Sequence, residues 1–94
     1  MRGVAEKTGA SGAELLAAVA VGLEVATRVG LGLVPQTFRG RGWHAPGVIG
    51  PFGGAAAAGR LLGLDAERLG WAFGFAASQA AGTYAQLGTP AIKF

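Results

Sequence analysis

The chain has 94 residues, with eight basic and five acidic side chains and a formal net charge of +3. Charged residues make up 14% of the composition, against roughly 25% in an average soluble domain, so little of the surface is suited to face water. The absence of cysteine excludes disulfides, thiolate zinc sites and cysteine-ligated iron–sulfur clusters within these residues. The basic residues are spread along the chain, so we expect no nucleic-acid partner.

Small residues dominate the apolar part of the composition. The chain contains 18 glycines, and alanine outnumbers leucine, isoleucine and phenylalanine together. Helices built from such residues approach closely but bury little area each, which is a poor basis for stability at this size. We therefore expect residues 1–94 to be part of one helical domain that other sequence completes. The isolated chain is then expected to be inactive, and to self-associate or unfold at low temperature.

Two helices are expected in the first third of the chain. A short one over 4–7 ends at Gly9, and no apolar run precedes Glu6 and Lys7, so we expect a cytoplasmic protein without a signal peptide. Ser11 and Glu14 have the spacing of a capping box, which begins a helix over 12–29. Its apolar face is predicted from residues at helical spacing, namely Leu15, Leu16, Val19, Leu23, Ala26 and Val29.

An ion pair and helix-breaking residues are predicted near the end of this helix. Glu24 and Arg28 lie four apart in the favourable order for an ion pair, which would contribute a few tenths of a kcal/mol if exposed. Pro35 is expected to stop the helix after the glycines near its end.

Two further helices are predicted after a Gly/Pro-rich segment. The first covers 52–62, with Pro51 tolerated in its first turn and Gly63 as its stop. The second covers 66–81 with Asp65 as its cap. Its apolar face is expected to comprise Leu69, Ala72, Phe73, Ala76 and Ala80. Small residues also recur every four positions, at Gly70, Gly74, Ser78 and Gly82.

The spacing of these small residues would permit another helix to approach closely, as in membrane dimers. Charged residues interrupt every apolar run of spanning length in this region, so tight packing within a soluble domain is expected and no membrane association. The fold class is all-α: an Ala/Gly-rich helical bundle with a long Gly/Pro loop between its first two main helices.

That loop, over 39–54, is the segment most suited to carry function. It holds the only histidine, His44, with Trp43 and two arginines, Arg39 and Arg41. Loops between rigid helices often carry site residues. His44 can exchange a proton near physiological pH, and helix amides near 51–54 could bind a carboxylate. His44 could equally be a loop histidine that is hydrogen-bonded for structure, and the two arginines could be merely solvated.

Other kinds of site are disfavoured. The glycine-rich segment lacks the Gly-Lys-Ser/Thr ending of a phosphate-binding P-loop. A single histidine without cysteine and with few nearby carboxylates disfavours a metal site. Lys93 is a further candidate cation for an anion.

Six segments, in their order and spacing, resemble the MmgE/PrpD family: SGAELLAA at 11–18, GLEV at 22–25 with Arg28, RGWH at 41–44, GPFGGAAAA at 50–58, LLGLD at 61–65 and SQAAG at 78–82. The family includes 2-methylcitrate dehydratase and cis-aconitate decarboxylase. The resemblance implies a piece of a large helical domain, usually accompanied by a smaller α+β domain. It also implies a homodimer that works without an iron–sulfur cluster, and we expect no cofactor.

The resemblance also implies roles for individual residues. His44 stands at the position of the family's site histidine, as a proton-transfer or substrate-orienting group. Lys93 stands at the site lysine, where it would bind a substrate carboxylate, and Arg41 would assist. The sequence departs from the family at Leu23, where tyrosine is common, and at 45–47, where Ala-Pro-Gly replaces Pro-Thr. The histidine expected after Lys93 is also missing.

The expected function is thus that of a lyase fragment acting on a small di- or tricarboxylate. Dehydratase, decarboxylase and epimerase activities stay open. One alternative is a non-catalytic helical interaction module, or an inactive remnant of such an enzyme. Another is RNA binding by residues 39–43 through cationic and stacking contacts.

Overall fold

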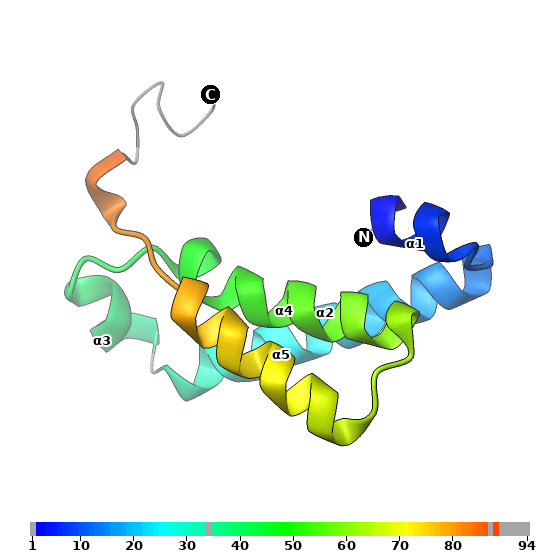
Figure 1. Ribbon diagram of the computed structural model, residues 1–94. Coiled ribbons are helices and arrows are strands. Elements are labelled where there is room, and N and C mark those ends of the chain that lie inside the picture. The colour runs from blue at the N-terminus through cyan, green and yellow to red at the C-terminus, as the bar shows by residue number, and fades with distance from the viewer. Residues whose placement is uncertain (1, 34, 87, 89–94) are drawn as a thin grey trace.

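The computed structural model describes residues 2–33, 35–86 and 88, which form five α-helices and one 3-10 turn (Figure 1). The only β pairing among them is an isolated antiparallel bridge between Trp43 and Thr83. The all-α prediction is confirmed. The elements are α1 (Arg2–Thr8), α2 (Gly12–Gly32), α3 (Pro35–Gly40), α4 (Ala45–Leu62), α5 (Ala66–Gln79) and the 3-10 turn η1 (Tyr84–Gln86).

Helices α2 and α4 form the centre of the molecule. They run side by side in opposite directions, and α5 packs against α4 (Figure 1). Helix α1 packs against α4 as well. Helix α4 is therefore the element that the other long helices share.

The predicted helix ends are largely confirmed. At the start of α2 the Ser11 hydroxyl accepts the Glu14 amide at 3.1 Å, and the Glu14 carboxylate accepts the Ser11 amide at 3.3 Å. Gly63 ends α4 in the left-handed conformation, with φ of 68°. Asp65 caps α5 by accepting the Arg68 amide at 2.8 Å. Each of these polar contacts satisfies a backbone group that the helix itself leaves unpaired.

The long loop predicted over 39–54 is wrong in extent. Helix α3 begins at Pro35, and α4 begins at Ala45 rather than at 52, so only residues 41–44 lie between them. Pro51 is inside α4, where its missing N–H leaves the Gly47 carbonyl without the usual helical donor. Glycine and proline in this part of α4 have a low helix propensity, and packing against α2 and α5 keeps them helical.

Glycines allow α2 and α4 to approach at backbone distance. A Cβ added to Gly22 would lie 2.9 Å from the Gly53 carbonyl oxygen, and one added to Gly53 would lie 2.9 Å from the Gly22 oxygen. The alanines around them, Ala18, Ala56 and Ala57, are buried.

The buried face of α2 is therefore rotated away from the predicted apolar face. Leu16, Val19 and Leu23 of that face are exposed. The larger side chains lie outside the contact because only glycine and alanine fit between helices this close.

Helix α5 buries the face that was predicted. Leu69 lies against Gly59 of α4, where it would meet an added Cβ at 2.9 Å. The Phe73 ring is 6.3 Å from the Phe52 ring, and Ala76 is buried. The opposite face carries Trp71 and Phe75, which are 60% and 75% exposed.

The close approach predicted at the small residues of α5 is not found. Among the described residues, nothing lies within 4 Å of a Cβ added to Gly70 or Gly74.

The core of the described residues is built from alanine. All its buried hydrophobic residues are alanines: Ala5, Ala18, Ala56, Ala57 and Ala76. A core made of alanine agrees with the expectation that these helices bury little area.

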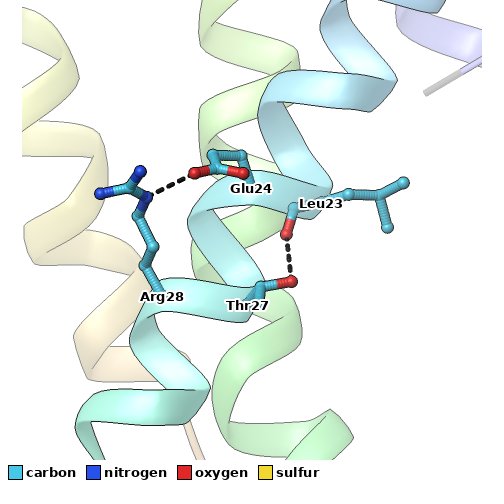
Figure 2. Close-up of polar contacts among 4 residues, drawn as sticks. All are labelled: Leu23, Glu24, Thr27 and Arg28. Carbon is cyan, nitrogen blue, oxygen red and sulfur yellow. Dashed lines mark hydrogen bonds and ion pairs between the residues drawn. The ribbon is translucent and has the colours of Figure 1, made fainter.

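Helix α2 is also long and apolar enough to cross a membrane, with 21 residues and a mean hydropathy of 1.6. Core helices of water-soluble proteins meet the same criteria, so this property assigns no membrane role. The exposed face of α2 carries the predicted ion pair between Glu24 and Arg28, and beside it the Thr27 hydroxyl donates to the Leu23 carbonyl (Figure 2).

Candidate functional site

His44 is placed by the turn that joins α3 to α4. It is the N-cap residue of α4 with extended backbone, φ −91° and ψ 109°, and its side chain does not cap the helix. The side chain is half-buried. The imidazole is therefore available for a role other than ending the helix.

A pair of backbone hydrogen bonds ties this turn to the segment after α5. The His44 amide donates to the Gly82 carbonyl at 3.0 Å, and the Tyr84 amide donates to the Gly42 carbonyl at 3.0 Å. The two bonds flank the bridge between Trp43 and Thr83. We call residues 42–44 and 82–84, with these two bonds, the backbone clamp.

Glycines make the clamp possible. A Cβ on Gly47, in the first turn of α4, would lie 2.5 Å from the Ala81 carbonyl oxygen, so no larger residue fits without movement. Gly82 has φ of 143°, a conformation that residues with a side chain rarely adopt. The sequence therefore allows two segments almost forty residues apart to meet beside His44.

Tyr84 is the clearest residue that sequence reasoning missed. Its ring lies edge-on to the His44 imidazole, with centroids 5.5 Å apart. Aromatic pairs favour this geometry. No local sequence signal indicates the contact, because it depends on the pairing of residues 42–44 with residues 82–84.

The N-terminus of α4 supplies partial positive charge next to His44. The first-turn amides of a helix lack intrahelical partners, and Pro46 has no amide to leave unpaired. The end of a helix with this polarity attracts anions. The anion-binding amides were predicted near 51–54, and that prediction is wrong, because the helix begins at Ala45.

The predicted cations have different positions. Arg41 is exposed in the turn before His44, and Arg39 is exposed in the last turn of α3. Neither forms an ion pair among the described residues. Lys93 lies outside the described residues.

No metal site is found in the part of the chain that the structure describes, since no three histidine, cysteine, aspartate or glutamate side chains cluster there. The described arrangement thus offers an imidazole, a helix N-terminus and an exposed guanidinium. These groups suit the binding of an anion and the transfer of a proton.

Comparisons with known proteins agree on one family. A family model, the MmgE/PrpD N-terminal domain, matches residues 2–93. The cis-aconitate decarboxylase-like protein oryM of Aspergillus oryzae is 39% identical over 79 residues, which cover 84% of this chain and 16% of that protein. The cis-aconitate decarboxylase of Aspergillus terreus is 38% identical over 72 residues, which cover 77% of this chain and 15% of that protein. No solved structure matches.

This chain thus spans less than a fifth of the length of the relatives that it matches. The family model, in contrast, covers nearly all of the chain and includes His44, Tyr84 and the backbone clamp. The chain belongs to the MmgE/PrpD family, within its N-terminal domain.

Proposed function

We propose that this chain contributes His44 and Arg41 to a lyase site that acts on a small di- or tricarboxylate. The observation that carries the proposal is the position of His44 at the N-terminus of α4, held there by the backbone clamp. Two relatives are named cis-aconitate decarboxylase and cis-aconitate decarboxylase-like protein, which agrees with a tricarboxylate as substrate.

Each group has a chemical role in such a site. Lyase chemistry next to a carboxylate needs a group that moves a proton and cations that hold the carboxylates. The His44 imidazole transfers the proton or orients the substrate. Arg41 and the amides of the first turn of α4 bind carboxylate oxygens, and Lys93 supplies a further cation. Decarboxylation and dehydration both use such groups, so this set by itself does not choose between the two reactions.

A binding experiment tests the site without requiring turnover. Because His44 is the only histidine, its imidazole Cε1–H gives a single, assigned NMR signal. We expect cis-aconitate and 2-methylcitrate to move this signal with saturation, and the trimethyl ester of cis-aconitate to leave it unchanged. Arg41→Gln should weaken the binding about ten-fold, as expected for the loss of a charge-assisted hydrogen bond.

Arg60 provides the matched control, since it is an exposed arginine in the last turn of α4, at the opposite end from His44. Arg60→Gln should leave the titration unchanged. An unmoved His44 signal, or equal weakening by both variants, would contradict the proposed site.

Turnover separates the two reactions. Because we expect these 94 residues to be inactive by themselves, the assay uses a protein that also contains the rest of the helical domain. It is incubated with cis-aconitate or 2-methylcitrate, and the products are identified by mass spectrometry as loss of CO₂ or loss of water. His44→Ala should abolish whichever reaction occurs. Activity retained by this variant would contradict the role given to the imidazole.

The second candidate function is a non-catalytic helical interaction module. The exposed aromatic residues on α5, Trp71 and Phe75, favour it, because large apolar patches commonly mark protein contacts. This function predicts that carboxylates leave the His44 NMR signal unchanged, whereas the lyase site predicts a saturable shift. The NMR titration therefore distinguishes the two functions.

A further inference from the structure

A separate pocket lies on the other side of the first turn of α4. It has a volume of about 210 Å³, is partly open to solvent, and lies between α2, the turn after it, α3 and α4. Most of its lining is apolar. The lining residues are Thr27, Gly30, Leu31, Leu33, Phe38, Arg39, Ala45 and Ile49.

The pocket is distinct from the surroundings of His44. Two residues of α4 one turn apart, Ala45 and Ile49, line the pocket. Gly47 lies instead against Ala81, the residue just before the 82–84 segment of the clamp. Residues two apart on a helix point roughly 200° apart around the axis. The first turn of α4 therefore separates the pocket from the His44–Tyr84 pair.

The polar groups of the lining define the chemistry of a ligand. The Thr27 hydroxyl already donates to the Leu23 carbonyl at 2.8 Å, so it is not a free donor (Figure 2). Among the described residues of the lining, Arg39 alone is charged, and it forms no ion pair with another described residue. An apolar cavity with one cation suits an anion that carries an apolar body.

Size narrows the ligand further. Pockets for drug-sized molecules usually have volumes of roughly 300–1,000 Å³, and this one is smaller. Phe38 offers an aromatic face, and its ring stacks on Trp43 with centroids 6.3 Å apart. We propose that the pocket binds a small aromatic or short-chain aliphatic monocarboxylate, with the carboxylate on Arg39 and the apolar body between Phe38 and Ile49.

Gly30 gives a way to fill the pocket without disturbing the helix. A Cβ added there would lie 3.7 Å from Ile49 Cδ1, an ordinary contact, so a longer side chain extends into the cavity. Gly30 is within α2, where leucine has a better helix propensity than glycine. Gly30→Leu should therefore fold and block the ligand. Ala45→Leu fills the same space from α4 and provides a second, independent variant.

Equilibrium dialysis with radiolabelled benzoate tests the proposal, since it counts bound ligand whatever the association state of the chain. The unmodified chain should bind benzoate saturably, close to one molecule per chain. Gly30→Leu and Ala45→Leu should abolish the binding, and Arg39→Gln should weaken it about ten-fold. Arg68→Gln removes an exposed arginine of α5 outside the pocket and should change nothing. Circular dichroism of each variant verifies that the helices are kept.

Three ligands complete the test. Hexanoate should compete with benzoate, whereas acetate, which lacks the apolar body, and benzyl alcohol, which lacks the charge, should not. The absence of saturable binding, binding that both filling variants retain, or equal binding of benzyl alcohol would overturn the proposal. His44→Ala should leave benzoate binding unchanged, so the outcome is independent of the proposed lyase site.

Discussion

The contact between α2 and α4 and the outer face of α5 use similar residues with opposite results. Both carry small residues four positions apart: Gly22 with Ala26 on α2, and Gly70 with Gly74 on α5. At Gly22 the partner backbone is so close that an added Cβ would lie 2.9 Å from a carbonyl oxygen, while Gly74 faces open space.

The neighbours of the small residues explain the difference. On α4 the residues around Gly53 are glycine and alanine over 53–59, so nothing holds the helices apart. On α5 the glycines alternate with Trp71 and Phe75, whose bulk stands above the helix surface. A ladder of small residues therefore makes a close contact where a facing helix also presents small residues, as α4 does to Gly22, and no such helix faces Gly70 and Gly74 among the described residues.

Alanine substitutions at the two places should have opposite signs, and this is the largest effect that we predict. Gly22→Ala places a methyl group against Gly53 and should lower the free energy of unfolding by about 1–3 kcal/mol, because overpacking forces the helices apart. Gly74→Ala meets no neighbour and should raise it by about 0.5–1 kcal/mol through helix propensity. Thermal and urea unfolding, followed by circular dichroism at one protein concentration, measure both. Equal shifts of the same sign would show that the α2–α4 contact is not close.

Replacing the exposed aromatic residues of α5 should show that its outer face, unlike the face of α2, is free to bind a second chain. We predict that the chain self-associates through this face, so Trp71→Gln and Phe75→Gln should each raise the dimer dissociation constant at least about ten-fold. Leu62→Gln, an exposed leucine at the end of α4, provides the control. Sedimentation equilibrium measures the three constants. A monomeric unmodified chain with a cooperative melt would contradict both this prediction and the expectation that other sequence completes the core.

The start of α4 also has one glycine against a neighbouring backbone and one without a neighbour, only three residues apart. Gly47→Ala would bring a methyl group within 2.5 Å of the Ala81 carbonyl and should open the backbone clamp, whereas Gly50→Ala meets no neighbour within 4 Å. We expect Gly47→Ala to lose the contact between His44 and Tyr84 and, with it, carboxylate binding. Nuclear Overhauser contacts between the two rings report the effect. Their survival in Gly47→Ala would show that the clamp does not position His44.

The exposed ion pair should have the smallest effect. Glu24 and Arg28 have side chains that are 61% and 77% exposed, so solvent screens their attraction. Glu24→Ala is expected to change the free energy of unfolding by no more than about 0.5 kcal/mol. Asp65→Ala, which removes the cap of α5, should cost about 1 kcal/mol in the same assay. A reversed order would mean that the ion pair is coupled to other groups.

Local signals account for what the sequence could predict. The capping box at Ser11, the left-handed Gly63 and the Asp65 cap each depend on a few adjacent residues, and all three are confirmed. The apolar face of α5 was predictable because its residues recur three and four positions apart, at helical spacing. The start of α4 was not, since Gly47, Gly50 and Pro51 favour irregular backbone and only packing keeps them helical.

The candidate site also has residues that could be predicted from the sequence and residues that could not. His44 and Arg41 could be selected from residue type and family resemblance, and the structure places both in the turn before α4. Tyr84 and the backbone clamp depend on contacts between distant segments. No pattern within a short window predicts such contacts.

The clamp joins two places that the chain separates by about forty residues through only the two backbone hydrogen bonds that form one bridge. Closing so long a segment costs chain entropy, and each doubling of its length adds about 0.6 kcal/mol. The two bonds should therefore form and break together. In native-state hydrogen exchange the amide protons of His44 and Tyr84 should share one opening free energy, lower than that of the central turns of α2 and α4. His44 would then lie in a part of the molecule where the clamp opens locally while the long helices stay packed.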